Sequence, residues 1–87
     1  MTRQTIVNSF LALLSLKISE IEKLFGKNFD PAYVEILIVD ELPSAHEKDE
    51  LESDLLNILT KQGWKTKYFK LLLEKPARIT VSFQISP

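Results

Sequence analysis

The chain has 87 residues, of which 45% are hydrophobic and 26% charged, a composition typical of one small folded domain spanning residues 1–87. It contains no cysteine, which excludes disulfide scaffolds, cysteine-ligated zinc, iron–sulfur clusters and thiol nucleophiles, and which fits a cytoplasmic protein. The formal net charge of −1 argues against a general binder of polyanions, because such proteins are usually basic.

The charged side chains are unevenly distributed along the chain. Residues 35–54 contain eight acidic side chains and one basic side chain, Lys48, whereas residues 61–78 contain six basic side chains and one acidic side chain, Glu74. This division predicts an acidic helix beside a basic strand. Two ordinary solvated surfaces would give the same pattern, so the division alone identifies no partner.

Residues 3–25 are predicted to form the first helix. Apolar side chains recur there at the spacing of one helix face: Val7, Phe10, Leu11, Leu14, Ile18, Ile21 and Phe25. The stripe is wider than contact with one layer requires, and Gly26 is the expected helix stop. Residues 6–18 are too short and too polar a stretch to span a membrane, and no cleavage site follows them, so no membrane contact is expected.

A turn at Asp30–Pro31 leads into a strand that is predicted over residues 33–39. Apolar residues occupy both even and odd positions of this strand, which predicts one covered face and a second face that is partly apolar. Ser44 and Glu47 have the spacing of a capping box, so a second helix is predicted to run from there to about residue 62 and to stop at Gly63.

The last third of the chain is predicted to form a β-hairpin, with strands over residues 64–73 and 78–86 and a loop over residues 75–77. In the strand over residues 78–86, apolar residues alternate with polar ones, which is typical of a strand with one buried face. Burying the apolar residues of both strands together predicts three opposed pairs: Phe69 with Phe83, Leu71 with Val81, and Leu73 with Ile79.

This register also predicts which side chains of strand 64–73 lie on the open face, the face of the sheet turned away from the helices. Thr66, Tyr68, Lys70 and Leu72 are expected there, whereas Lys65 and Lys67 are expected on the opposite face. Trp64 has the parity of the open face, unless a bulge near residues 65–67 turns it inward.

The predicted order of elements is α-β-α-β-β. Because a β-α-β crossover is right-handed, the third strand can pair between the first two, which gives the strand order 1-3-2. The expected fold class is therefore α+β, a two-layer sandwich in which two helices cover one face of a three-stranded antiparallel sheet. Phe83 and Val81 are expected in the core, on the central strand.

The sequence contains no catalytic motif. His46 is the only histidine, and the acidic side chains near it are Asp40, Glu41, Glu47 and Glu50. One histidine among carboxylates is a weak metal site, and helix capping explains the same residues, so a metal-dependent activity around His46 is the third hypothesis. Both glycines serve as helix stops, which leaves no phosphate-binding loop. We therefore expect no enzyme activity, no cofactor and no metal.

The open face is the main candidate site. Trp64, Tyr68 and Leu72, with Lys70 at the rim, have the aromatic and aliphatic centre and polar rim of a protein interface. Leu37 and Val39 of strand 33–39 are further candidates for the same patch. Partly exposed apolar side chains that have no function are the alternative, since they are normal on any protein surface. The expected function is that of an accessory, adaptor or inhibitor protein that binds another protein, or itself as a homodimer.

A nucleic-acid-binding module is the alternative function. Lys65, Lys67 and Lys70 interleave with aromatic residues, which suits a single strand because bases stack on rings while lysines follow the phosphates. The aromatic–glycine motif of RNA-recognition sheets is absent, and lysines also protect an edge strand against aggregation. A nucleic-acid affinity that depends strongly on salt would favour this alternative.

Overall fold

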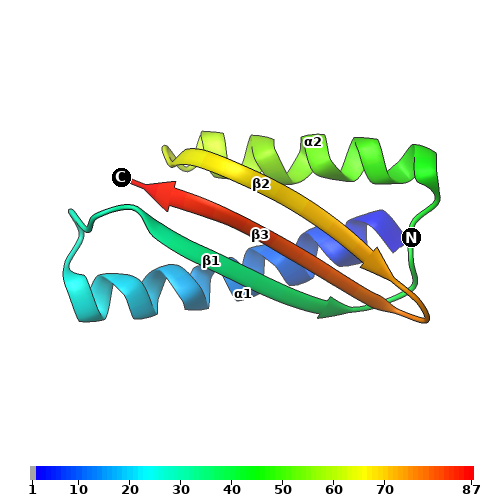
Figure 1. Cartoon of the computed structure of the whole chain (residues 1–87), viewed down its shortest axis with the longest axis horizontal. Coiled ribbons are helices and arrows are strands. Elements are labelled where there is room, and N and C mark those ends of the chain that lie inside the picture. Colours follow the sequence, from blue (N-terminus) through cyan, green and yellow to red (C-terminus); the bar gives the residue numbers. More distant parts are fainter. Residues whose placement is uncertain (1) are drawn as a thin grey trace.

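The computed structural model of the chain describes residues 2–87. The elements are α1 (Thr2–Phe25), β1 (Ala32–Val39), α2 (Ala45–Lys61), β2 (Lys65–Glu74) and β3 (Arg78–Ser86). Their order is α-β-α-β-β, and Figure 1 shows the three strands running across the molecule in front of the two helices. The predicted α+β fold class is confirmed.

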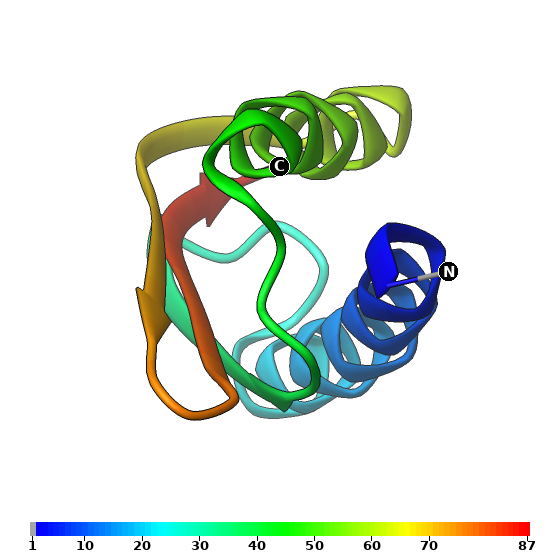
Figure 2. The same cartoon turned by 90° about the vertical axis from the view of Figure 1, so that its right-hand side faces the viewer.

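The sheet has the strand order β1-β3-β2, and both strand pairs are antiparallel. Leu71 pairs with Val81 and Leu73 with Ile79, as the burial pattern predicted, and Glu74 pairs with Arg78 at the end of the hairpin. Figure 2 shows the sheet edge-on, with both helices on one side of it and no helix or strand of residues 2–87 on the other. The sheet therefore has one covered face and one open face.

Local sequence signals explain where the helices begin and end. At the start of α2, the Glu47 backbone N–H donates to Ser44 Oγ at 3.2 Å, and the Ser44 backbone N–H donates to Glu47 Oε1 at 3.1 Å, which completes the predicted capping box. Gly26 follows α1 with φ +84°, and Gly63 follows α2 with φ +86°, a conformation that glycine adopts without strain. Both predicted helix stops are confirmed.

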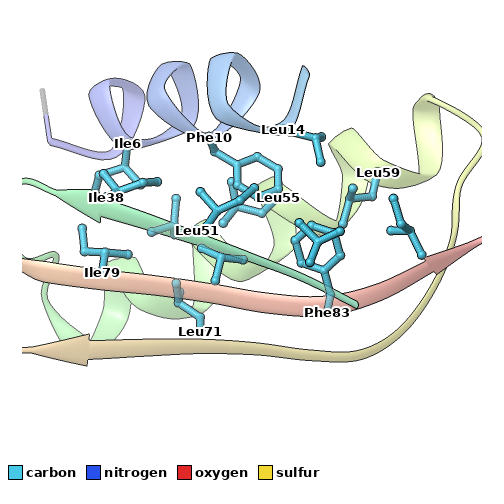
Figure 3. Packing of buried hydrophobic residues seen from close by; sticks show 14 of the residues in the cluster. Ile6, Phe10, Leu14, Ile38, Leu51, Leu55, Leu59, Leu71, Ile79 and Phe83 are labelled. Carbon is cyan, nitrogen blue, oxygen red and sulfur yellow. The ribbon is translucent and has the colours of Figure 1, made fainter. Parts of the chain in front are cut away.

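The hydrophobic core lies between the helices and the covered face of the sheet. Phe83, on the central strand, is fully buried, and its ring centroid lies 6.1 Å from that of Phe10 on α1 (Figure 3). The ring of Phe69 on β2 also lies 6.1 Å from that of Phe83. Val81 is also fully buried. The helices contribute the fully buried Ile6, Phe10 and Leu14 from α1 and Leu51, Leu55 and Leu59 from α2. The predicted central position of Phe83 and Val81 is confirmed.

The predicted apolar stripe of α1 is buried along only part of the helix. Ile6, which precedes the first residue of that stripe, is fully buried, whereas Phe25 at the last turn is 70% exposed. Figures 1 and 2 show that α1 and α2 lie close together at the first turns of α1 and diverge toward its end. The last turn of α1 therefore has no second helix to pack against. Within residues 2–87, neither helix is long and apolar enough to cross a membrane.

Candidate binding face of the sheet

A β-bulge in β2 decides which side chains reach the open face. Lys67 pairs with Gln84 and Lys70 with Ser82, so Tyr68 and Phe69 together lie opposite the single residue Phe83. Tyr68 takes up the extra residue with φ +59°, in the left-handed region that a bulky side chain rarely adopts. Every residue of β2 that precedes the bulge therefore lies on the face of the sheet opposite to the one that uninterrupted alternation predicts.

This reversal corrects the predicted placement of four residues, Lys65, Lys67, Thr66 and Trp64. Lys65 and Lys67 lie on the open face together with Lys70, so their expected separation from it was wrong. Thr66 pairs with the buried Ile85, and its hydroxyl is itself buried without a hydrogen-bond partner, so its place on the open face was also wrong.

Trp64 is the fourth residue whose predicted placement the structure corrects. Its side chain is partly buried against the hydrophobic core, with its ring 5.7 Å from that of Phe29, and its Nε1 donates to Gln62 Oε1 at 3.2 Å. The prediction that Trp64 lies on the open face was therefore wrong. The bulge that turns it inward lies at Tyr68, slightly beyond the stretch where a bulge was considered.

The register arranges the open face as rows, each running from β1 through β3 to β2. The row at the middle of β3 is Glu35–Ser82–Lys70. The neighbouring rows are Leu37–Thr80–Leu72 on one side and Tyr33–Gln84–Lys67 on the other, and the hairpin end carries Val39–Arg78–Glu74. We use the term open face for these four rows together with Tyr68 and Lys65.

Large apolar side chains gather on the open face. Five of them are each at least 43% exposed: Tyr33, Leu37, Val39, Tyr68 and Leu72. Leu37 and Leu72 lie in the same row, on either side of Thr80. The prediction from sequence missed Tyr33 and Glu35, although both alternate along β1 with its buried side chains.

Around the middle row, charges of opposite sign lie on the two edges of the open face, whereas at the hairpin end Arg78 of β3 pairs with Glu74 of β2. Glu35 is the acidic residue of β1, whereas β2 contributes Lys65, Lys67 and Lys70. Strands lie about 4.8 Å apart, so the backbones of Glu35 and Lys70 are about 10 Å from each other across Ser82. Among residues 2–87, no ion pair involves any of these four side chains.

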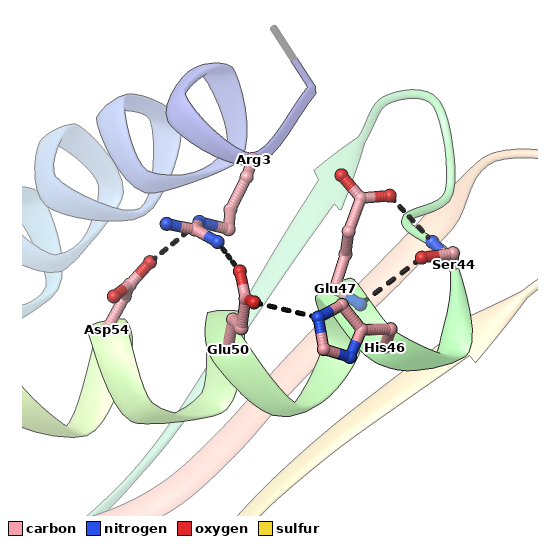
Figure 4. Close-up of polar contacts among 6 residues, drawn as sticks. All are labelled: Arg3, Ser44, His46, Glu47, Glu50 and Asp54. Carbon is pink, nitrogen blue, oxygen red and sulfur yellow. Dashed lines mark hydrogen bonds and ion pairs between the residues drawn. The ribbon is translucent and has the colours of Figure 1, made fainter.

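The acidic group around His46 lies at the start of α2, away from the sheet face (Figure 4). His46 Nε2 contacts Glu50 Oε1 at 3.0 Å, and Glu50 forms an ion pair with Arg3, which also contacts Asp54 through Nε at 3.1 Å. The two contacts of Arg3 join α1 to α2, whereas the contact of His46 with Glu50 lies within α2. No group of three or more His, Cys, Asp or Glu side chains in the described part of the chain is arranged to hold a metal ion.

The pKa of Glu47 is altered by the capping box. The hydrogen bond from the backbone N–H of Ser44 stabilises the carboxylate, and the hydroxyl of Ser44 adds to the effect, so the pKa of Glu47 lies below its usual value. This shift is the expected consequence of helix capping.

Comparison of the chain with protein-family models, with curated proteins and with solved structures finds no match in any of the three. The chain is a small two-layer α+β protein, and a fold of this kind does not by itself indicate a function. The open face is the feature of the chain that bears on what it binds.

Proposed function

We propose that the open face is a protein-binding surface, through which the chain acts as a non-enzymatic accessory, adaptor or inhibitor protein of the cytoplasm. The observation that carries the proposal is the gathering of five exposed apolar side chains on one uncovered sheet face. Exposed apolar groups that adjoin one another, with a polar rim, are typical of interfaces, whereas isolated ones are normal on any surface.

The residues proposed to bind the partner differ in part from those predicted from the sequence. Tyr68, Lys70 and Leu72 remain in the set. Trp64 leaves it, because its side chain packs against Phe29. Leu37, which the sequence offered only as a further candidate, joins the set because it lies in the row of Leu72 and is 51% exposed.

The bulge also favours a second candidate function, the binding of single-stranded nucleic acid. It brings Lys65 and Lys67 onto the same face as Lys70, with the exposed ring of Tyr68 between them. Such a strip offers one ring for base stacking and three positive charges for phosphates. Glu35 in the middle row and the net charge of −1 weigh against it, so protein binding is the leading proposal.

The proposal is tested by a variant of the open face and a matched variant of a helix. Leu37→Ser with Leu72→Ser removes the apolar row, whereas Leu16→Ser with Leu24→Ser removes two exposed leucines of α1. Tagged wild-type chain and both variants are used to capture partners from the native host, and separately to capture an untagged copy. The wild type and the α1 variant should retain the same partner, and the open-face variant should lose it.

Circular dichroism shows whether each variant is folded, which is expected because all four leucines are exposed. Retention of the partner by the folded open-face variant would contradict the proposal. The second candidate predicts instead that Lys65→Gln with Lys67→Gln weakens binding to a labelled oligothymidine. It also predicts that the negative slope of log affinity against log salt becomes shallower by about 1.4, because two phosphate contacts are removed.

A further inference from the structure

The two edges of the open face complement each other in the middle row and in the rows on either side of it, but not in the row at the hairpin end, where Val39 lies opposite Glu74. In the middle row β1 carries the acid Glu35 and β2 the base Lys70. In the neighbouring row the two edges carry Leu37 and Leu72. The β1 edge of one copy can therefore pack against the β2 edge of a second copy, and the β2 edge of the first against the β1 edge of the second.

One two-fold axis produces that match. If the axis runs parallel to β3 in the plane between two facing sheets, β1 of one copy lies over β2 of the other, and each row meets the same row. Glu35 then faces Lys70 of the partner subunit, and Leu37 faces Leu72 of the partner subunit. Because the interface is isologous, each contact occurs twice. In the next row Tyr33 faces Lys67 of the partner subunit, an arrangement suited to a cation–π contact.

The other in-plane axis gives a poor match. An axis that crosses the strands at the middle row places β1 over β1 and β2 over β2. Glu35 then faces Glu35 of the partner subunit, and Lys70 faces Lys70 of the partner subunit. Like charges placed against each other in an interface oppose association. The axis parallel to β3 brings Arg78 near Arg78 of the partner subunit, but at the hairpin end of the face, where Glu74 of each copy adjoins the arginine. The charges of the middle row, at the centre of the interface, therefore select the axis parallel to β3.

The dimensions of the open face suit such a dimer. Facing sheets pack about 10 Å apart, a gap that extended glutamate and lysine side chains can bridge from opposite sides. The middle of β3 carries the short side chain of Ser82, which is only 8% exposed, so the central strand does not hold the sheets apart. The three strands, the longest of 10 residues, span roughly 33 × 14 Å, which is about 460 Å² of projected area. Stable interfaces of ordinary size use about 800 Å² of accessible surface per partner, so the open face corresponds to a small interface and a weak dimer.

Tyr68 supplies a second, independent observation. A bulky residue in the left-handed region is strained, and such strain is found preferentially at sites of function. The strained residue lies on the open face, next to the middle row, and its side chain is 76% exposed.

We infer that the partner of the open face is a second copy of this chain, in a face-to-face dimer whose two-fold axis runs parallel to β3. This inference rests on the proposed function, since it names the partner of the same surface. It makes the pairing of Glu35 with Lys70 of the partner subunit the contact that sets the orientation of the two copies.

Charge reversal tests the orientation. The E35K chain carries bases at both positions of the middle row, and the K70E chain carries acids at both. Each variant alone should dimerise at least tenfold more weakly than the wild type in sedimentation velocity at moderate salt. An equimolar mixture of the two should form a heterodimer with wild-type affinity, because every base then faces an acid. The double variant E35K/K70E should form a homodimer.

Recovery in the mixture also shows that both variants are folded, and an ion pair within one chain cannot produce it. If both single variants dimerise like the wild type while the L37S/L72S variant does not, the open face is used in another orientation. The inference then fails and the proposed function stands. A wild type that stays monomeric at millimolar concentration overturns the inference alone, provided that the open-face variant loses a different protein partner. If the L37S/L72S variant dimerises like the wild type, the two copies associate through another surface and the inference fails; the proposed function fails with it if this variant also retains the captured protein partner.

Discussion

Replacing Tyr68 with glycine should affect stability and self-association in opposite directions, which tests whether the strain at the bulge serves the open face. Tyr68 has φ +59° at the bulge, a position where left-handed bulges usually carry glycine. An L-residue in this region costs about 1–2 kcal/mol, which glycine avoids because it has no Cβ. The Tyr68→Gly change should therefore relieve strain in the folded chain.

The net gain is smaller than the strain itself. Glycine has more freedom in the unfolded chain, which offsets about 0.5–1 kcal/mol. The Tyr68 side chain is 76% exposed, so its removal takes little apolar surface from the core. We expect Tyr68→Gly to raise the free energy of unfolding by about 0.5–1 kcal/mol, which corresponds to about 2–8 °C in Tm for a domain of this size. The same change should weaken self-association, because the exposed ring is lost.

Urea and thermal unfolding followed by circular dichroism measure this effect. The chain must be dilute enough to be monomeric, because dimerisation adds to the apparent stability. Tyr68→Ala is the matched control, since alanine keeps the Cβ and the strain and should give no gain. If Tyr68→Gly lowers the free energy of unfolding by about 1 kcal/mol or more, the ring stabilises the single chain and the reasoning about the bulge is refuted.

Three further changes test the fold. Phe83→Ala should lower the free energy of unfolding by about 3–5 kcal/mol, because the ring is fully buried on the central strand; a loss below about 1 kcal/mol in urea unfolding would contradict that position. Thr66→Val should raise it by about 1 kcal/mol, because the buried hydroxyl has no partner; a decrease in thermal stability would show that the hydroxyl is bonded. Because the pKa of Glu47 is lowered in the folded chain, its contribution to stability is complete above the unfolded value near 4.5 and is lost as the pH falls through the folded value. Glu47→Gln should flatten this part of the stability–pH curve, and an unchanged curve would contradict the assignment.

The elements of the fold could be predicted because burial and capping leave local signals. The alternation along β3 predicted its bounds, Arg78–Ser86, without error. Ser44 and Glu47 marked the start of α2 through side-chain bonds that involve only their own turn. The exposure of Phe25 could not be predicted, because periodicity shows which side chains share a helix face but not how far the neighbouring elements extend.

The bulge at Tyr68 explains why the site was predicted only in part. A left-handed bulge is usually marked by glycine, and a tyrosine gives no such signal. The available clue was a change of parity among the lysines, with Lys65 and Lys67 at odd positions and Lys70 at an even one. The role proposed for Glu35 depends on its register with Ser82 across two strands that are far apart in the sequence, so no local pattern indicates it.

Association of two copies through the open face is tested most directly by amide proton–nitrogen NMR spectra of the labelled wild-type chain, recorded from micromolar to millimolar concentration. Signals that change with concentration should belong to the rows around Ser82, including Glu35, Leu37, Lys70 and Leu72, while those of the outer surfaces of α1 and α2 stay constant. Changes confined to the helices, or no change up to millimolar concentration, would contradict the dimer.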